Sequence, residues 1–390
     1  MRILFSCTSG DGHLYPMLPL AKALQALGHE VAFAMAEPYA DRVEAAGLTW
    51  LPAGIGPDEL HRRMFLQHDE LVDLPLEHQI FISRFALGDA PDRAADLHRV
   101  IADWSPDLLI SEPCDLAGPP EAAAAGVPIV LHSFGRPLAR EYYELASPFV
   151  APLWRAVGLE PRELCGVYGP LYVDICPPSL RGEAVPIGTK VLQLRPTTPA
   201  LAAAEPAWLT SLPDRPTVYV TLGTIFNAVD RFPPLLSALG GLECNVIVTI
   251  GRDNDPSDLA PIPANAVVER FIPQDLLLPH VDVMVGHGGS GSMLAALARG
   301  IPALMLPAGA DQFENADACH RLGLARVLLP HEVTPDAVRD QVAILLSDES
   351  YQQRARALAE DIARMPEPCD VAAAVISEHL SSKAGALTPR

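Results

Sequence analysis

The chain has 390 residues, of which 49% are hydrophobic and 19% are charged. This length accommodates two domains with separate hydrophobic cores. The formal net charge of −20 argues against nucleic acid or an anionic membrane surface as a partner, because both repel an acidic chain. No apolar run is long enough for a signal peptide or a membrane span, so we expect a cytoplasmic protein.

Seven cysteines are scattered along the chain without a CxxC pair. We expect them to be reduced and mostly buried thiols. The DxD-like run at 253–255 follows a predicted strand and precedes a proline, so we interpret it as a turn. With no other clustered carboxylates and no ligand spacing typical of zinc, we predict no metal and no cofactor.

The first 35 residues predict a strand, a loop, a helix and a second strand. Apolar runs at 2–7 and 30–35 flank a polar loop and a segment of helical spacing at 14–27. This unit is typical of parallel α/β proteins. The loop lacks the GxGxxG pattern, and no acidic residue stands where a dinucleotide ribose needs one, so we do not expect a nicotinamide site.

Two polar side chains follow predicted strands in this half. His13 follows the first strand, and Glu112 follows the apolar run at 106–111, with Asp115 close behind. Open parallel sheets place their ligands at the carboxyl ends of their strands. A carboxylate that orients an imidazole is the usual partner of a histidine base, so we predict a catalytic pair of His13 with Glu112, or with Asp115 as second choice. Capping of a helix at 118–125 is the alternative role for both carboxylates.

Residues 52–92 show weak periodicity and many apolar side chains, which suits a lid over a hydrophobic substrate. A helix is predicted at 140–147, ended by Pro148. Helices that simply pack on the domain are an equally good interpretation for any single residue. The candidate acceptor-binding residues are Phe65, Phe81, Phe85 and Tyr142.

A proline-bearing segment at 196–211 predicts a linker between a first domain at 1–195 and a second at 212–375. The second domain repeats the strand-and-helix pattern, with predicted strands at 217–221, 245–250, 267–271, 281–285 and 301–306. Helices are predicted at 334–346 and 351–365. We expect residues 376–390 to form a polar tail.

The glycine-rich turn at 286–292 lies between a predicted strand and a predicted helix. Glycines let the backbone approach a ligand, and the helix N-terminus favours a phosphate. Asp311 would repel a phosphate but suits the hydroxyls of a sugar, and Gln312 beside it both donates and accepts. The segment therefore predicts a nucleotide-sugar site. The alternative is an ordinary strand, turn and helix with a capping serine, which explains His287 and Asp311 less well.

Five segments carry a family resemblance: GHLYP at 12–16, LGT at 222–224, FIPQ at 271–274, HGGSGS at 287–292 and DQFENA at 311–316. In this order they resemble the inverting nucleotide-sugar glycosyltransferases of GT-B fold, most closely the bacterial enzymes that act on polyketides, macrolides and enediynes. The resemblance covers essentially the whole chain. It implies two facing Rossmann-like parallel-sheet domains with a cleft between them.

The resemblance also implies roles for individual residues. His13 would deprotonate the acceptor hydroxyl and Glu112 would orient His13. The family often has Asp where Glu112 stands and Trp where Phe271 stands. The donor-binding set comprises Gly12, Thr224, Phe271, Ile272, Gln274, His287, Gly289, Ser290, Gly291, Ser292, Asp311 and Gln312.

The function implied is transfer of a sugar, expected to be a deoxysugar, from a dTDP or UDP donor to a hydrophobic aglycone, with inversion and without a metal. A non-catalytic donor-binding helper subunit of the same fold and a sugar-nucleotide epimerase are the alternatives; the intact pair of His13 and Glu112 argues against the first. The sequence leaves open the aglycone, the sugar, the nucleotide, the type of linkage, an auxiliary protein and a homodimer.

Overall fold

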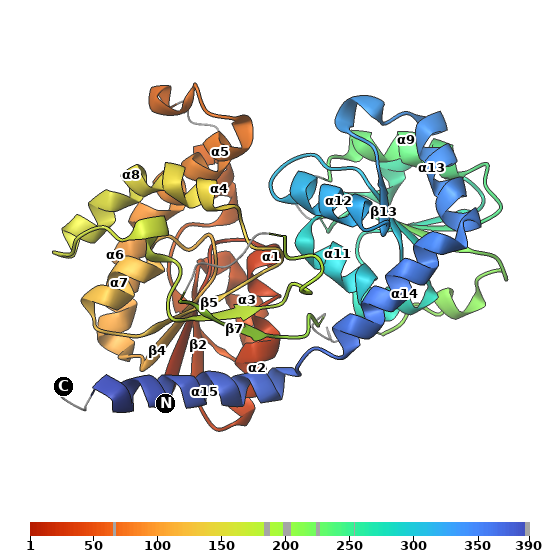
Figure 1. The fold of residues 1–390 in the computed structure, drawn as a ribbon. Helices are drawn as coiled ribbons and strands as arrows, with labels where there is room; N and C mark the ends of the chain where they lie inside the picture. Colours follow the sequence, from red (N-terminus) through yellow and green to blue (C-terminus); the bar gives the residue numbers. More distant parts are fainter. Residues whose placement is uncertain (65–67, 183–187, 198–203, 224–226, 253, 387–390) are drawn as a thin grey trace. The chain divides into compact units, whose positions relative to one another are not determined.

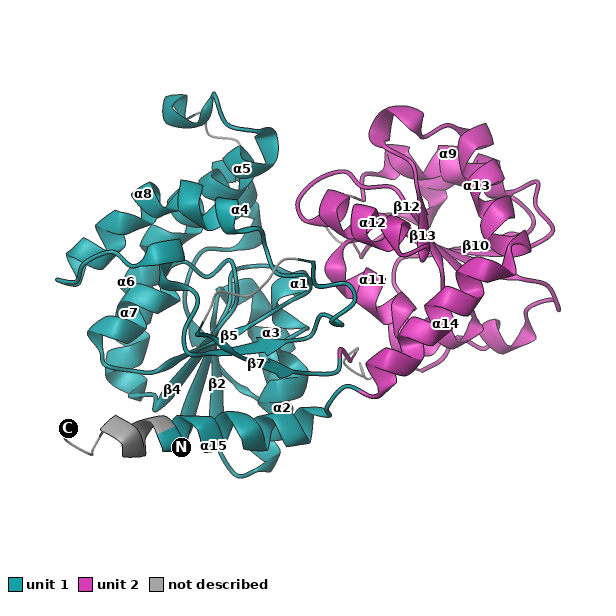
Figure 2. Cartoon of the chain, in the orientation of Figure 1, with its two compact units in different colours: residues 1–195, 365–390 teal, residues 196–364 magenta. Residues whose placement is uncertain are grey.

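Two parallel β-sheets organise the chain, each in its own compact unit (Figures 1 and 2). The computed structural model describes residues 1–64, 68–182, 188–197, 204–223, 227–252 and 254–386, with the backbone alone at 382–386. Unit 1 comprises Met1–Arg195 and Met365–Arg390, and unit 2 comprises Pro196–Arg364.

Unit 1 contains a seven-stranded sheet in the order β3-β2-β1-β4-β5-β6-β7, in which every pairing is parallel. Its central strands are apolar and buried, as expected for a sheet covered on both faces. The strands are β1 (Arg2–Ser6), β2 (Glu30–Met35), β3 (Thr49–Pro52), β4 (Leu108–Ser111), β5 (Ile129–His132), β6 (Leu171–Asp174) and β7 (Lys190–Gln193).

Helices cover both faces of this sheet. α6, α7 and α8 pack against one another, whereas α2 packs with α15 (Figure 1). The α-helices are α1 (Asp11–Leu14), α2 (Leu18–Ala26), α3 (Ala40–Ala45), α4 (Pro57–Met64), α5 (Leu76–Phe81), α6 (Ala90–Trp104), α7 (Gly118–Ala124), α8 (Arg140–Ala156) and α15 (Pro368–Ala386). A π-helix, η3 (Ile82–Asp89), joins α5 to α6, and short 3₁₀ turns are η1 (Glu37–Tyr39), η2 (Asp69–Leu71) and η4 (Glu163–Gly166).

Unit 2 contains a six-stranded parallel sheet in the order β10-β9-β8-β11-β12-β13. Its strands are β8 (Thr217–Thr221), β9 (Asn245–Thr249), β10 (Ala266–Glu269), β11 (Val283–Gly286), β12 (Ala303–Met305) and β13 (Ala325–Val327). The α-helices are α9 (Phe232–Leu239), α10 (Gln274–Leu277), α11 (Ser290–Leu297), α12 (Gln312–Arg321), α13 (Pro335–Ser347) and α14 (Glu349–Ala363). The 3₁₀ turns are η5 (Leu209–Ser211), η6 (Val229–Arg231), η7 (Pro256–Leu259), η8 (Leu278–His280) and η9 (Pro330–Glu332).

The carboxyl end of the chain differs from the prediction. We expected the second domain to continue to 375 and a polar tail to follow, but the chain leaves unit 2 after Arg364 and joins unit 1 (Figure 2). Helix α15 buries Val371, Ala372 and Val375 and packs on α2. Lys190 Nζ on β7 lies 2.5 Å from Glu378 Oε1, which adds a second attachment to unit 1.

Helix α8 also differs from the prediction, which ended it at Pro148. The helix continues through Pro148 and Pro152 to Ala156. Its buried side Tyr143, Ala146, Val150 and Trp154 packs into the unit 1 core, and this packing outweighs the lost backbone hydrogen bonds.

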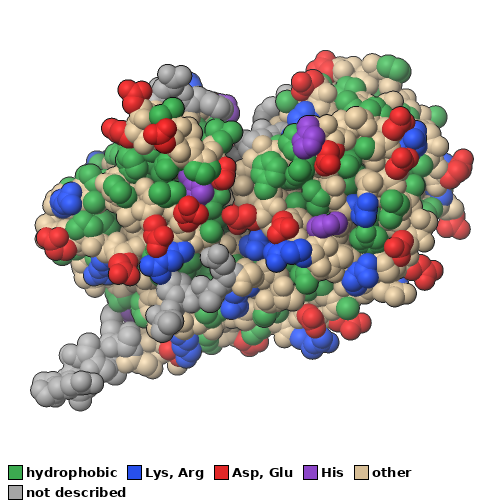
Figure 3. Space-filling view, turned by 45° about the horizontal axis from the view of Figure 1, so that its top comes forward, with side chains coloured by type: hydrophobic (Ala, Val, Ile, Leu, Met, Phe, Trp, Pro, Cys, Tyr) green, Lys and Arg blue, Asp and Glu red, His purple; other side chains and the backbone are tan. Residues whose placement is uncertain are grey.

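Within the part of the chain that the structure describes, no helix combines the length and apolar character needed to cross a bilayer. Acidic and basic side chains are interspersed over the face seen in Figure 3. Six of the seven cysteines are buried, Cys369 on α15 is exposed, and no disulfide joins any of the seven.

Candidate active site

The register of β1 and β4 brings His13 to Glu112. Ser6 at the end of β1 pairs with Ser111 at the end of β4, so the loops that follow leave the sheet side by side. The strand order reverses between these two strands, which is where open α/β sheets bind ligands. Nδ1 of His13 lies 3.2 Å from Oε1 of Glu112.

Glu112 is completely buried and is held by the backbone of both loops. The Thr8 N–H donates to Oε1 at 3.1 Å, and the Cys114 N–H donates to Oε2 at 2.7 Å. Burial by itself raises the pKa of this carboxyl. Its interactions with His13 and with the two backbone donors lower the pKa by a larger amount, so the pKa lies below its ordinary value. An ionised carboxylate therefore faces the imidazole.

Asp115, the second-choice partner of His13, has a different role in the structure. Its Oδ1 accepts from the N–H of Gly118 at 3.0 Å, at the start of α7. Burial raises the pKa of Asp115 even though Arg93 opposes that shift. Asp115 thus serves as the helix-capping carboxylate, and Glu112 is the carboxylate that lies against His13.

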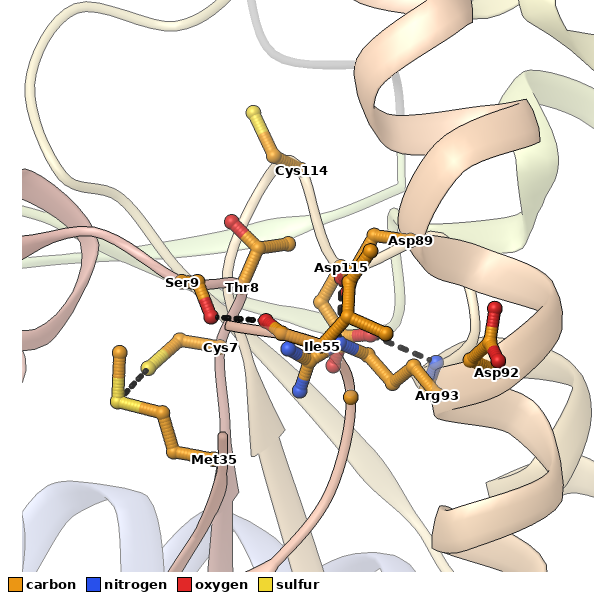
Figure 4. A network of polar contacts seen from close by, with 12 residues as sticks. Cys7, Thr8, Ser9, Met35, Ile55, Asp89, Asp92, Arg93, Cys114 and Asp115 are labelled. Atoms are coloured by element: carbon orange, nitrogen blue, oxygen red, sulfur yellow. Dashed lines mark hydrogen bonds and ion pairs between the residues drawn. The ribbon is translucent and has the colours of Figure 1, made fainter. Parts of the chain in front are cut away.

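A buried ion pair between Arg93 and Asp89 lies near these loops (Figure 4). Nε of Arg93 lies 2.7 Å from Oδ2 of Asp89, and neither side chain is more than 1% exposed. Burial lowers the pKa of the guanidinium, but Asp89 and Asp115 raise it above its ordinary value. In the same region the Ser9 hydroxyl donates to the Ile55 carbonyl at 2.6 Å, which connects the β1 loop to the segment after β3.

Aromatic side chains surround His13. Its ring makes edge contacts with two phenylalanines. The ring centroids are 5.8 Å apart for Phe85 on the π-helix and 5.1 Å apart for Phe134 after β5. Phe81 contacts both Phe85, at 5.3 Å, and Tyr142, at 5.2 Å. Three of the predicted acceptor-binding residues therefore form one aromatic cluster next to His13, although Phe81 and Tyr142 are 5% and 8% exposed and belong mainly to the core. Phe65 lies outside the described residues.

Gly10 and Gly12 shape the loop that carries His13. A β-carbon at Gly10 would lie 2.7 Å from Cδ2 of the imidazole, so a side chain there would displace the ring. Gly12 is exposed in the short helix α1 and has open space around it. The His13 side chain is 16% exposed, which leaves one side of the imidazole open to a substrate.

Unit 2 repeats this arrangement at its own point of strand-order reversal. Thr221 at the end of β8 pairs with Gly286 at the end of β11, and Gly223 and His287 follow these strands. A β-carbon at Gly223 would lie 2.6 Å from Nε2 of His287, and one at Gly289 would overlap the same atom. Glycine is therefore required on both sides of this imidazole.

His287 is buried beside the glycine turn. We expected a donor able to carry positive charge beside a diphosphate, and this stays a prediction. Without a ligand, burial lowers the pKa of His287 to about 4, although Asp311 opposes that shift. In the ligand-free chain the imidazole is therefore neutral at pH 7 and offers an N–H rather than a cation.

Asp311 is bonded to the glycine turn. Ser290, at the first position of α11, donates to Oδ2 of Asp311 at 2.6 Å. Asn315 donates to the same oxygen at 2.9 Å, to Ser290 Oγ at 3.1 Å and to the Gly288 carbonyl at 2.9 Å. One carboxylate oxygen is thus used within unit 2, and no hydrogen bond to the other oxygen is found among the residues that the structure describes.

The remaining donor-binding candidates lie around this turn. Gln312 is 3% exposed, and its Oε1 accepts from Ala308 N at 2.8 Å and Gly309 N at 3.3 Å. Gln274 Nε2 donates to Ser292 Oγ at 3.1 Å. Ile272 is buried, and Gly291 is exposed at the start of α11. Thr224 lies outside the described residues.

Phe271 is 37% exposed, and the Arg252 guanidinium lies over its ring at 3.7 Å from the centroid. The DxD-like run is a turn at its described end, because Asp255 accepts from the N–H of Ser257 at 2.9 Å and pairs with Arg270 at 2.8 Å. Asp253 lies outside the described residues.

Sequence reasoning missed Phe134, Arg252 and the role of Asn315. Phe134 follows β5, so the rule that located Glu112, a side chain just after a parallel strand, could have found it. Arg252 also follows a strand, β9. Asn315 stands in the DQFENA segment, four residues after Asp311, but its bond to the Gly288 carbonyl, 27 residues away, depends on tertiary packing.

The sequence matches two family models. Residues 22–223 match the N-terminal domain, and residues 234–377 the C-terminal domain, of the erythromycin biosynthesis protein CIII-like family. The chain is 35% identical over 404 residues to L-demethylnoviosyl transferase of Streptomyces niveus, with 100% of both chains covered.

Solved structures of glycosyltransferases have the same fold as this chain. The glycosyltransferase SnogD from Streptomyces nogalater matches with a TM-score of 0.79 and 27% identity, over 97% of this chain and 99% of that one. The spinosyn rhamnosyltransferase SpnG complexed with thymidine diphosphate matches with a TM-score of 0.81 and 26% identity, over 96% and 100%. The expected GT-B fold is confirmed. The chain belongs to the erythromycin biosynthesis protein CIII-like family and is a bacterial natural-product glycosyltransferase.

Proposed function

We propose that this glycosyltransferase inverts the anomeric configuration and moves a sugar from a dTDP-sugar to a hydroxyl of a hydrophobic aglycone, with His13 as general base. The observation that supports this most is the 3.2 Å pair of His13 with the buried, ionised Glu112. A carboxylate at Nδ1 keeps the proton on that nitrogen, so Nε2 is free to accept one. The aromatic cluster beside His13 suits an apolar acceptor.

The glycine turn of unit 2 is proposed to hold the donor. The N-terminus of α11 favours the diphosphate, and the neutral His287 adds one N–H. Asp311 and Gln312 bind the sugar hydroxyls, and Phe271 stacks on the pyrimidine, with Ile272 and Gln274 beside its edge. The thymidine diphosphate in the related SpnG structure favours a thymine nucleotide over uridine. The name of the Streptomyces niveus relative favours a modified sugar.

The reaction is a single displacement. The acceptor oxygen loses its proton to Nε2 of His13 as it bonds to the anomeric carbon, and the bond from that carbon to the diphosphate oxygen breaks. Glu112 stabilises the imidazolium that forms. Hydrogen bonds from the α11 N-terminus and His287 stabilise the charge that develops on the departing nucleoside diphosphate, so we propose that no metal is needed.

The test begins with a panel of dTDP- and UDP-sugars in a thermal-shift assay, since a ligand that binds only the folded state raises the melting temperature. The donor that gives the largest shift is then incubated with phenolic and macrolide acceptors. We expect a glycoside of inverted anomeric configuration, detected by NMR coupling constants, in the presence of EDTA. A retained configuration, or product formation that stops with EDTA, would contradict the mechanism. Donor binding without any transfer would favour the helper-subunit alternative.

A further inference from the structure

The catalytic pair has a thiol beside it. His13, Glu112 and Cys114 each offer one ligand atom, and these three atoms lie within 4.8 Å of one another. Figure 4 shows Cys114 on the loop after β4, above Thr8 of the loop after β1. Glu112 and Cys114 are buried, and His13 is partly exposed, so the cluster is reached from the side of the imidazole.

The three atoms are the ligand types that zinc prefers, namely an imidazole nitrogen, a carboxylate oxygen and a thiolate sulfur. Zinc bonds of about 2.0 to 2.3 Å in a tetrahedral arrangement place the ligand atoms about 3.3 to 3.8 Å apart. The ligand atoms of the cluster lie within 4.8 Å of one another, so the widest separation has to close by about 1 Å when zinc binds. Two backbone donors already hold Glu112, and an ionised carboxylate retains lone pairs for a metal.

We propose that His13, Glu112 and Cys114 form an inhibitory Zn²⁺ site. The ion bonds to one nitrogen of His13, one oxygen of Glu112 and the sulfur of Cys114, and the Cys114 thiol releases its proton to solvent as the zinc–sulfur bond forms. No redox change occurs, and water completes the coordination. This inference rests on the proposed function, because inhibition follows only if His13 is the base.

Inhibition rather than catalysis follows from the identity of the ligands. Zinc on either nitrogen stops His13 from acting as a base. Zinc at Nε2 takes the lone pair that accepts the proton, and zinc at Nδ1 replaces the contact with Glu112. Cys114 is the member of the cluster that the proposed reaction does not use. Replacing it therefore removes a zinc ligand and leaves the catalytic pair in place, because Glu112 contacts the Cys114 backbone N–H rather than its side chain.

The first measurement is metal binding to the whole, substrate-free protein. Titration with Co²⁺, a spectroscopic substitute for Zn²⁺, is expected to give one equivalent with a thiolate-to-cobalt charge-transfer band in the near ultraviolet. Cys114→Ala and the closer isostere Cys114→Ser should lose the band and bind Zn²⁺ at least about tenfold more weakly. Cys369→Ala is the matched control, because Cys369 is the exposed cysteine on which adventitious zinc would bind.

The second measurement is glycosyl transfer as a function of free Zn²⁺. The inhibition constant of Cys114→Ala is expected to exceed that of the wild type and of Cys369→Ala by at least about tenfold. A charge-transfer band that persists in both Cys114 variants, or that disappears in Cys369→Ala, would overturn the site. Loss of the band with Cys114 together with undiminished turnover in zinc would leave the metal site standing and instead remove His13 from the mechanism.

Discussion

Glu112 is the residue on which the chemistry proposed for unit 1 depends. A buried carboxyl ordinarily becomes harder to ionise, yet here the imidazole of His13 and two backbone N–H groups lower its pKa. The backbone donors come from two different loops, so the carboxylate also fixes the position of one loop against the other. Its charge and its position therefore have the same structural origin.

Replacing His13 by Ala should lower turnover by about two to four orders of magnitude, which is the contribution of general-base catalysis. Donor affinity should stay nearly constant, because the residues expected to bind the donor, apart from Gly12, lie in unit 2. Initial rates and calorimetric titration with the nucleoside diphosphate measure the two effects. His98→Ala is the control, since this histidine is exposed on α6 and pairs with Glu121. Unchanged turnover in the His13 variant would exclude it as the base.

Asp311 has two separable roles. Its Oδ2 accepts from Ser290 and Asn315, whereas the other oxygen is proposed to bind a sugar hydroxyl. Asp311→Asn can keep the first role by presenting its own oxygen to both donors, but it turns the ligand-facing acceptor into a donor. Asp311→Ala loses both roles.

We therefore expect Asp311→Asn to weaken binding of the dTDP-sugar by about one to two orders of magnitude, the range for a lost hydrogen bond to a charged group. Binding of free dTDP should change little in this variant, and Asp311→Ala should weaken both ligands because Ser290 loses its anchor. Calorimetry of the four combinations checks this. Equal losses of dTDP-sugar and dTDP in Asp311→Asn would show that Asp311 does not bind the sugar.

Some site residues could be predicted from the sequence because their placement follows from strand ends. Glu112 and His287 stand directly after an apolar strand and His13 lies in the loop segment that follows one, and in a parallel sheet such positions converge. The neutrality of His287 could not be predicted, because it results from burial between Gly223 and Gly289, which depends on tertiary packing. The stacking of Arg252 on Phe271 could not be predicted either, since it joins two loops that are separate in the sequence.

Helix α12 is attached to the glycine turn chiefly by Asn315. The side chain is completely buried and donates to three oxygens, so it couples the position of α12 to that of α11. An element that carries the residues proposed to bind the sugar is thereby held at a defined distance from the turn proposed to bind the diphosphate. Asn315 is a positioning residue in this scheme.

Asn315→Ala should lower the free energy of unfolding by about 1 to 3 kcal/mol, because it leaves buried acceptors without donors. It should also weaken dTDP binding to the folded protein. Asn265→Ala is a matched control: its Nδ2 donates to the carbonyls of Leu239, Leu242 and Cys244, just before β10 and away from the strands' carboxyl ends. Urea unfolding and calorimetry separate stability from affinity. Similar dTDP affinities in the two variants would refute the positioning role.

Secondary structure could be predicted where the sequence pattern of a single element determines it. It could not be predicted where packing between elements determines it. The strands β1, β2, β8 and β9 carry apolar runs that only a buried strand explains. By contrast, Pro148 predicted an early end to α8, and the core contacts that carry the helix past Pro148 and Pro152 are not visible in the local sequence. The π-helix η3 likewise has no simple sequence pattern.

The whole chain consists of two parallel-sheet units that place ligand-binding residues by the same rule. In each, the loops after the two strands at the reversal of strand order supply the candidate residues. This arrangement, and hence the fold class, could be predicted from the repeated strand-and-helix pattern. The return of α15 to unit 1 could not, because the apolar side chains of a terminal helix do not indicate which core they will cover.

Each unit also contains a buried histidine that is held in neutral form, His132 in unit 1 and His287 in unit 2, which makes the stability of the molecule depend on pH. Burial lowers the pKa of His132 in unit 1 and of His287 in unit 2 to about 4. An unfolded histidine has a pKa of about 6.5. Between these values the unfolded chain binds protons that the folded chain does not. The free energy of unfolding therefore falls as the pH falls from about 6.5 towards 4.

Each histidine should contribute a slope of at most about 1.4 kcal/mol per pH unit in this window. His132→Gln and His287→Gln should each flatten the pH dependence of unfolding relative to the wild type, whatever their effect at pH 7. Buried carboxyls such as Asp115 and Asp174, whose pKa burial raises, act in the opposite direction but cancel in the difference between wild type and variant. Urea unfolding at pH 5 and pH 7 measures this difference. His331→Gln, at an exposed position on η9, should keep the wild-type slope; a slope that changes as much in this control would mean that the buried imidazoles are not its source.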